Sequence, residues 1–359
     1  MEITFLVGNG FDMAAGVDTS YSGFYKWYIE QPSDNPSISQ IKDMIRKDIE
    51  SGSQYWADFE VGLGRFTEEF TLANENSFLD CYEDAQVQLP EYLKSECNGK
   101  EYYPDKETIE LAKTTLSNFY SGITPVEQTD IEALFKADSG SNSRIHFISY
   151  NYTDILDKYV KIIAATPIKV WTYGNTTFKM TVDPRVIHVH GYTNHYPIIG
   201  VNDDSQINNK ELLSSPVLPQ TLIKPTAVSA VGELWHKNAE TMISQSRIVC
   251  VFGMSLGCTD AKWWRKLVEW LKADNGRRLI LFWHKRSWVN SVSTRKKIEL
   301  NQEVKDRLIS YSSNKESARA AIYNRIYVCV NTDIFPIKLT NEITEDAVAA
   351  SAEKSEVNA

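Results

Sequence analysis

Short, nearly continuous apolar segments alternate with amphipathic segments along most of the chain. The apolar segments are rich in β-branched and aromatic residues, as are strands that are buried on both faces. They cover residues 3–7, 144–150, 186–190, 247–252, 278–283 and 325–330. Apolar residues recur at helical spacing in segments between them, including 38–49, 155–159, 261–273 and 296–309. This alternation predicts an α/β fold, with a mostly parallel sheet that is covered by helices on both faces.

One long segment departs from this alternation. Residues 38–138 contain helical patterns and loops but no segment that predicts a strand, which is far more chain than one crossover requires. We therefore expect an α/β domain formed by residues 1–37 and 139–340. The helical insertion between its two parts would act as a cap that gates the site, or as a partner-binding module. Residues 341–359 are polar and small and predict a disordered tail.

Composition narrows the class of protein. The chain has 359 residues, 42% hydrophobic and 24% charged, which is the usage of a globular protein with a sizeable core. Its apolar segments are too short for a signal peptide or a membrane span, so we expect a cytoplasmic protein without a membrane partner. The five cysteines form no CxxC pair, which disfavours structural zinc and disulfides. A net charge of −9 disfavours nucleic acid as a partner.

Polar or glycine-rich segments follow four of the expected strands. Ligands of open α/β sheets bind beyond the carboxyl ends of the strands, so we expect these segments to form one site. They are residues 8–12 (Gly-Asn-Gly-Phe-Asp), 149–154 (Ser-Tyr-Asn-Tyr-Thr-Asp), 188–191 (His-Val-His-Gly) and 253–260 (Gly-Met-Ser-Leu-Gly-Cys-Thr-Asp). Each also has a structural explanation, in which glycines close a tight turn and an Asp or Asn caps the next helix. The GxGxxG of ordinary dehydrogenases is absent, since Met13 stands at its last position.

Three ionisable side chains allow more than one interpretation. His188 and His190 lie two residues apart, so in a continuous strand both imidazoles face the same side. They are a structural pair, a metal pair, or a pair in which His190 is a general base. Glu60 lies one helical turn after Trp56 and is either a surface carboxylate or a side chain that reaches the site.

Taken in order, these motifs resemble the AbiH family of phage abortive-infection proteins. The resemblance spans residues 3–260 and includes two further segments of the chain. These are residues 19–21 (Thr-Ser-Tyr) and 56–60 (Trp-Ala-Asp-Phe-Glu), and residues 253–256 (Gly-Met-Ser-Leu) are the part of the last motif that carries it. The motif order is also similar to that of the Rossmann-like sirtuin fold, and to the stand-alone sirtuin-like NAD hydrolases of antiphage defence.

The resemblance implies a role for each motif. Gly8 and Gly10 would bind the NAD phosphates, Asn151 would serve the nicotinamide ribose, and His190 would be the base. Gly253 and Ser255 would contact the distal nucleotide. The remaining binding residues implied by these motifs are Asn9, Phe11, Asp12, Asp154, Gly191 and Leu256.

Three departures from the sirtuin pattern limit the resemblance. The zinc-binding cysteine pairs of the sirtuin deacylases are missing, which disfavours protein deacylation. Asp154 lies three residues after Asn151, where the pattern has an acidic residue two residues after the asparagine. Asn9 and Asp12 replace the small residues and the serine of the first turn.

We therefore expect an antiphage NAD glycohydrolase that releases nicotinamide and ADP-ribose, with Asn151 and His190 catalytic and no metal. NAD or a related dinucleotide is the expected ligand, and a second copy of the chain or a phage-derived trigger is the candidate macromolecular partner. Two alternatives stay open. One is a non-catalytic nucleotide sensor. The other is a metal-dependent phosphoesterase or nuclease with the ligands His188, His190, Asp12 and Asp154.

Overall fold

One seven-stranded sheet organises the computed structural model, which describes residues 1–52, 58–195, 197–285 and 293–339. The strand order in these residues is β3-β4-β2-β1-β5-β6-β7, and all neighbours are parallel except the antiparallel pair β3 and β4. The strands are β1 (Glu2–Val7), β2 (Ser143–Ser149), β3 (Lys169–Tyr173), β4 (Thr176–His188), β5 (Ile248–Phe252), β6 (Arg278–Trp283) and β7 (Ile326–Val330). The expected mixed α/β fold with a mostly parallel sheet is confirmed.

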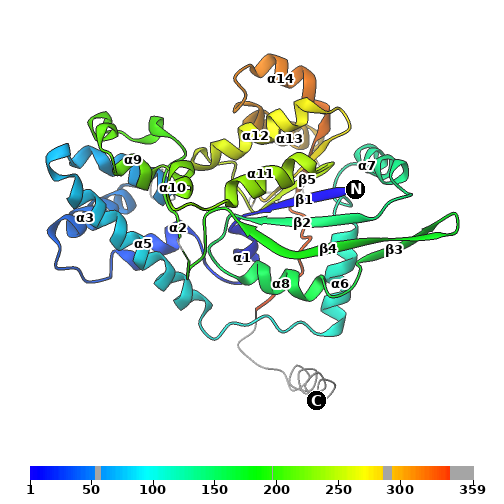
Figure 1. The fold of residues 1–359 in the computed structure, drawn as a ribbon, viewed down its shortest axis with the longest axis horizontal. Coiled ribbons are helices and arrows are strands. Elements are labelled where there is room, and N and C mark those ends of the chain that lie inside the picture. Colours follow the sequence, from blue (N-terminus) through cyan, green and yellow to red (C-terminus); the bar gives the residue numbers. More distant parts are fainter. Residues whose placement is uncertain (53–57, 196, 286–292, 340–359) are drawn as a thin grey trace.

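The sequence prediction differs most from the structure at the β3–β4 hairpin. Strand β3 was not predicted, and β4 begins at Thr176 and ends at His188, whereas the prediction covered residues 186–190. The hairpin projects from one edge of the sheet (Figure 1), and most side chains of β3 and of the first half of β4 are exposed or half-exposed. It therefore lacks the continuous apolar pattern of the buried strands.

Helices cover both faces of the sheet, as expected. Alternate side chains of the central strand β1 point to opposite faces, with Phe5 on one and Leu6 on the other. The Phe5 face packs against α1 (Gly10–Ala14), α6 (Lys106–Ser117), α7 (Pro125–Ala137) and α8 (Ile155–Ile163). The Leu6 face packs against α11 (Trp235–Gln245), α12 (Ala261–Ala273), α13 (Thr294–Ile309) and α14 (Lys315–Ile322).

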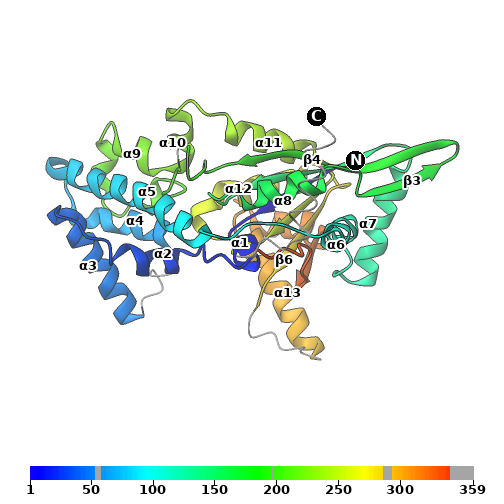
Figure 2. The same cartoon turned by 90° about the horizontal axis from the view of Figure 1, so that it is seen from below.

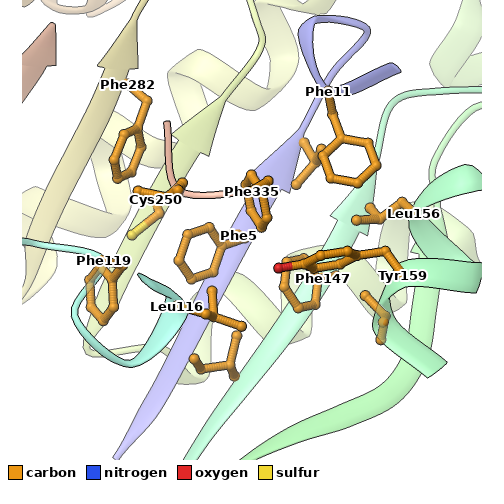
Figure 3. Close-up of a cluster of buried hydrophobic side chains, with 14 of the residues drawn as sticks. Phe5, Phe11, Leu116, Phe119, Phe147, Leu156, Tyr159, Cys250, Phe282 and Phe335 are labelled. Carbon is orange, nitrogen blue, oxygen red and sulfur yellow. The ribbon is translucent and has the colours of Figure 1, made fainter. Parts of the chain in front are cut away.

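Aromatic rings hold β1 in place on the first face. The ring centroid of Phe5 lies 5.4 Å from that of Phe147 on β2, 5.6 Å from Phe119 and 5.9 Å from Phe335 (Figure 3). Phe11, in the helix that follows β1, joins the same cluster through a contact of 5.3 Å with Phe335. This packing fixes the carboxyl end of β1, which is where the candidate site begins.

A separate hydrophobic cluster forms a helical lobe at the carboxyl-terminal edge of the sheet (Figures 1 and 2). It combines α2 (Tyr21–Tyr28), α3 (Pro36–Ser51), α4 (Phe59–Phe66) and α5 (Glu75–Cys97) with the chain that leads to α9 (Leu218–Leu222) and with α9 itself. Helix α10 (Lys224–Ala230) follows directly. Short 3-10 helices are η2 (Thr67–Glu69), η3 (Leu72–Asn74), η4 (Asp204–Gln206), η5 (Lys210–Ser214), η6 (Cys258–Asp260) and η7 (Tyr323–Arg325). We call the group formed by α2, α3, α4, α5, α9 and the chain that leads to α9 the lobe.

The lobe does not coincide with the predicted insertion. The described part of residues 38–138 holds helices and no strand, but α6 and α7 pack on the sheet, and α2 belongs to the lobe. The domain boundaries at residues 38 and 138 stay a prediction. The expected tail, residues 341–359, lies outside the described residues. No helix in the described part of the chain is long and apolar enough to cross a bilayer.

Candidate functional site

A cavity of about 300 Å³ lies where the lobe meets the carboxyl ends of β1, β2 and β5. This volume is at the lower end of the range of ligand pockets. The turns after these strands contribute Gly8, Asn9, Asp12, Tyr150, Asn151, Tyr152, Thr153, Gly253, Met254, Ser255, Gly257, Thr259 and Asp260. His190 lines the cavity as well, and the lobe adds Tyr21, Asp58, Glu60, Leu89 and Leu93. As expected from the sequence, residues that follow several strands line one cavity.

Glycines bring the turns after β1 and β5 into direct contact. The Gly8 amide donates to the Phe252 carbonyl at 2.9 Å, and the Gly10 amide donates to the Gly253 carbonyl at 3.0 Å. A Cβ on Gly10 would lie 2.5 Å from the Gly253 Cα, and Gly253 has a φ of +69°. The two amides predicted to bind phosphate therefore bond the end of β5 and the turn after it, and glycine permits the close approach of the two backbones. Phe11 points into the core of the sheet (Figure 3).

Asp12 lies fully buried beneath the first turn. Its Oδ1 accepts a hydrogen bond from the Asn151 side-chain amide at 2.9 Å, and its Oδ2 accepts one from the Thr153 hydroxyl at 2.6 Å. Burial raises the pKa of Asp12 to about 7, although both hydrogen bonds oppose this rise. Asp12 lies within α1 and is not the cap of that helix, so its carboxylate positions Asn151 and Thr153.

Asn151 is held in one orientation by its amide group. Its Nδ2 donates to the Gly8 carbonyl at 3.2 Å as well as to Asp12, so both amide hydrogens are used. Its Oδ1 is buried and has no hydrogen-bond partner in the described part of the chain. The same holds for Tyr150 Oη and Thr19 Oγ1, which belong to residues of the same cavity wall. Since buried polar atoms nearly always have partners, these three atoms favour a polar ligand here.

His190 lies against the same wall, between two tyrosine rings. Its ring centroid is 5.5 Å from that of Tyr150 and 6.2 Å from that of Tyr152. Its Nε2 lies 3.3 Å from Asp260 Oδ1. Burial lowers the pKa of His190, and the charge of Lys224 lowers it further, while Asp260 opposes both. This lowering of the pKa favours the neutral imidazole, which is the form that a general base requires.

The expectation that His188 and His190 face the same side is wrong. Strand β4 ends at His188, and the chain turns away at Gly191, whose φ is +78°. The His188 ring bonds Asp157 at 2.8 Å and the Asn151 carbonyl at 2.9 Å, and it lines a different groove, between β4 and α11. His188 therefore supports the backbone of Asn151 from behind the cavity.

Lys224 and Asp260, which lie beside His190, were not named individually as site residues. Lys224, at the start of α10, is 2% exposed, and its Nζ donates to Glu60 Oε2 at 2.7 Å and to Asp260 Oδ1 at 3.0 Å. Burial raises the pKa of Glu60. The charge of Lys224 and the hydrogen bond with His190 hold the pKa of Asp260 well below its usual range despite burial. Of the two interpretations of Glu60, the structure shows the one in which it lines the cavity. Its neighbour Trp56 lies outside the described residues.

The remaining predicted binding residues lie at different distances from the cavity. Ser255 lines it, whereas Leu256, with a φ of +53°, is buried in the core on the Leu6 face. Asp154 points away, with a largely exposed side chain that lies 3.4 Å from Lys158. The position two residues after Asn151 is Thr153, whose hydroxyl bonds Asp12.

The four side chains of the metal-site alternative do not meet. His188 and Asp154 lie outside the cavity that Asp12 and His190 line. Within the described ranges, no group of three or more His, Cys, Asp or Glu side chains is arranged to hold a metal ion.

The fold and the cavity define an α/β protein with a buried polar site at the carboxyl-terminal edge of a mostly parallel sheet. The family model described as "Bacteriophage abortive infection AbiH" matches residues 4–282, which is well over half of the chain. The chain therefore belongs to the AbiH family, and its role lies in abortive-infection defence against phage. A search of curated proteins gives no match to this chain.

Proposed function

We propose that this protein is an NAD glycohydrolase, which hydrolyses the bond between nicotinamide and ribose to give nicotinamide and ADP-ribose. The observation that carries the proposal is the state of Asn151. Its amide hydrogens are fixed by Gly8 and Asp12, so its unpaired Oδ1 is preorganised to accept a hydrogen bond from a ligand in the cavity. Neutral His190 lies in the same cavity wall.

The topology of the sheet supports a dinucleotide as that ligand. Without the antiparallel strand β3, the sheet has the order β4-β2-β1-β5-β6-β7. When these six parallel strands are renumbered from one to six along the chain, this order is 3-2-1-4-5-6. This is the order of the Rossmann fold, in which the ligand binds where the strand order reverses. That point lies beside β1, whose carboxyl end opens into the cavity. The sirtuin-like motif order of the sequence agrees with this proposal.

The charge of the cavity wall suits the proposed reaction. Its described lining includes the carboxyl groups of Asp12, Asp58, Glu60 and Asp260 and no lysine or arginine side chain. Glycoside cleavage passes through an oxocarbenium-like state, in which positive charge develops on the ribose. Asp260, whose pKa stays well below its usual range, provides a negative charge in this wall that stabilises such a state. Asn9 and Ser255, which are exposed at the edge of the cavity, would contact the rest of the dinucleotide.

The proposed reaction needs one water molecule and one base. The water oxygen forms a bond to the ribose C1′, while the bond from C1′ to nicotinamide breaks and its electron pair leaves with the ring. His190 takes a proton from the water, and Asn151 Oδ1 accepts a hydrogen bond from a ribose hydroxyl or from that water. General-base help is worth ~10²- to 10⁴-fold, so positioning by the cavity must supply much of the remaining acceleration.

A nucleotide sensor is the second candidate, because unpaired buried atoms in a cavity favour binding whether or not turnover follows. It would use the same cavity and would bind NAD without releasing nicotinamide. The metal-dependent phosphoesterase or nuclease has less support, since its four proposed ligands lie apart.

The test is incubation of the purified full-length protein with NAD, with and without EDTA, followed by chromatography of nicotinamide and ADP-ribose. We expect both products in equal amounts and at the same rate with EDTA. His190→Ala should lower the rate by ~100-fold or more. Binding by calorimetry without product would support the sensor instead. Release of AMP and nicotinamide mononucleotide that stops with EDTA and returns with a divalent metal would support the metal-dependent phosphoesterase.

A further inference from the structure

Four ionisable side chains form a buried chain of contacts that runs from the lobe to His190. Glu60 of α4 contacts Lys224 of α10 at 2.7 Å, and Lys224 contacts Asp260 of η6 at 3.0 Å. The same Asp260 oxygen, Oδ1, lies 3.3 Å from His190 Nε2. Glu60, Lys224 and His190 are each less than 5% exposed. These contacts join segments that are up to 164 residues apart in the sequence.

Burial makes the charge of Lys224 costly in free energy. A buried ammonium group is costly unless carboxylates surround it, and here two of them do. Both carboxylates raise the pKa of Lys224, although burial lowers it, so the lysine stays charged. Because Lys224 and His190 share one oxygen of Asp260, the position of that oxygen depends on Lys224.

We propose that Lys224 is a positioning residue of this site, which holds Asp260 against His190 and so orients the imidazole that lines the cavity. Glu60 anchors Lys224 to the lobe, and the lobe thereby contributes to the geometry of the site. The proposal rests on the proposed role of His190 as the base. Lys224 itself does not line the cavity in the described residues, so it acts through Asp260.

The groups around His190 set the expected effect of each substitution. Lys224 lowers the pKa of His190, and Asp260 raises it. The other ionisable groups that face the ring are Tyr150, Tyr152 and, from α11, His236, whose Nδ1 lies 3.0 Å from Lys262 Nζ. Removal of Lys224 should therefore move the titration of His190 to higher pH, and Asp260→Asn should move it to lower pH.

The test is NMR titration of the six histidines in the full-length protein, with the His190 signal assigned by its loss in His190→Gln. Lys224→Met should shift that titration to higher pH. Glu60→Gln/Lys224→Met, which removes Lys224 together with the Glu60 charge that it neutralises, should shift it in the same direction. Asp130→Asn, which removes an ion pair with Arg278 on another part of the sheet, is the matched control and should leave it unchanged. An unchanged His190 titration in both Lys224 variants would overturn the proposal.

Kinetics add a second readout. In both Lys224 variants we expect the kcat of nicotinamide release to fall on the order of 10- to 100-fold, with KM within about twofold of wild type. The acid limb of the pH profile should move to higher pH with the titration of His190. Equal kcat in the variants and in Asp130→Asn would contradict the proposal. The NMR titration needs no turnover. If the His190 titration shifts in the Lys224 variants but the protein releases no nicotinamide, the glycohydrolase proposal is refuted and the positioning role of Lys224 stays supported.

Discussion

The side-chain amide of Asn151 lies 2.9 Å from Oδ1 of Asp12, and both residues are buried. This contact joins the turn after β2 to the helix after β1, and it fixes which end of the Asn151 side chain remains unpaired. The candidate site thus depends on a carboxylate that directs an amide oxygen.

We predict that Asp12→Asn lowers nicotinamide release on the order of 10- to 100-fold, because a 1 Å misplacement of a catalytic group can cost about 100-fold. The variant keeps the size of the side chain but replaces one acceptor oxygen with a donor, so it cannot accept from both Asn151 and Thr153. Rates are measured beside Asp130→Asn, which should match wild type. Full activity of Asp12→Asn would show that the carboxylate does not direct Asn151.

Asp12 should also make stability depend on pH. Its pKa is raised by folding to about 7, so the unfolded chain releases this proton near pH ~4 while the folded chain retains it to near 7. The stability that this proton contributes is complete below pH ~4 and is lost as pH rises through 7. Relative to Asp12→Asn, wild type should therefore lose at most ~4 kcal/mol of unfolding free energy between pH 4 and 8. Urea unfolding of both proteins measures this difference, and a constant difference across that range would refute it.

Gly253→Ala should be far more damaging than Gly99→Ala. Both glycines have a positive φ, +69° and +71°, so either alanine incurs a backbone penalty of about 1–2 kcal/mol. The added Cβ at Gly99 meets open space, whereas at Gly253 it would lie 2.9 Å from the Gly10 Cα and the Gly8 carbonyl oxygen. Overpacking adds about 1–3 kcal/mol at Gly253 alone. Thermal unfolding compares the two variants, and equal losses would count against the tight contact between the turns.

Thr153 and Asp154 are neighbours in sequence with different expected roles. Thr153→Val removes the hydroxyl that donates to Asp12 and keeps the shape, so we predict a loss of about 1–3 kcal/mol in stability and slower nicotinamide release. Asp154→Ala removes a largely exposed carboxylate and should leave both quantities within error of wild type. The reverse order of effects would restore the sequence-based assignment of Asp154 to the site.

Much of the fold follows from the sequence because burial imposes a periodic pattern. The strands that pack on both faces, such as β1 with Phe5 and Leu6, show continuous apolar segments, and each was predicted within a few residues of its bounds. The exposed residues of β3 are not subject to that constraint, and that strand was missed. The helix over Pro36–Ser51 was predicted from the spacing of its isoleucines, three of which are buried.

The candidate site was predicted less completely, because its geometry depends on contacts between distant segments. Asn151 and His190 were identified from motifs, and both line the cavity. The orientation of His188 was predicted wrongly, since the end of β4 cannot be located from two histidines at even spacing. Lys224 gave no signal, because its burial depends on Glu60 and Asp260, which lie 164 and 36 residues away in the sequence.

The most direct test of the central claim is the rate of nicotinamide release from NAD by the full-length protein, compared with Asn151→Ala and Asp130→Asn. We predict turnover by wild type and by Asp130→Asn, and a rate at least ~100-fold lower for Asn151→Ala, with all three proteins folded by circular dichroism. Undiminished release by Asn151→Ala would contradict the account, as would a folded wild-type protein that binds NAD and releases no nicotinamide.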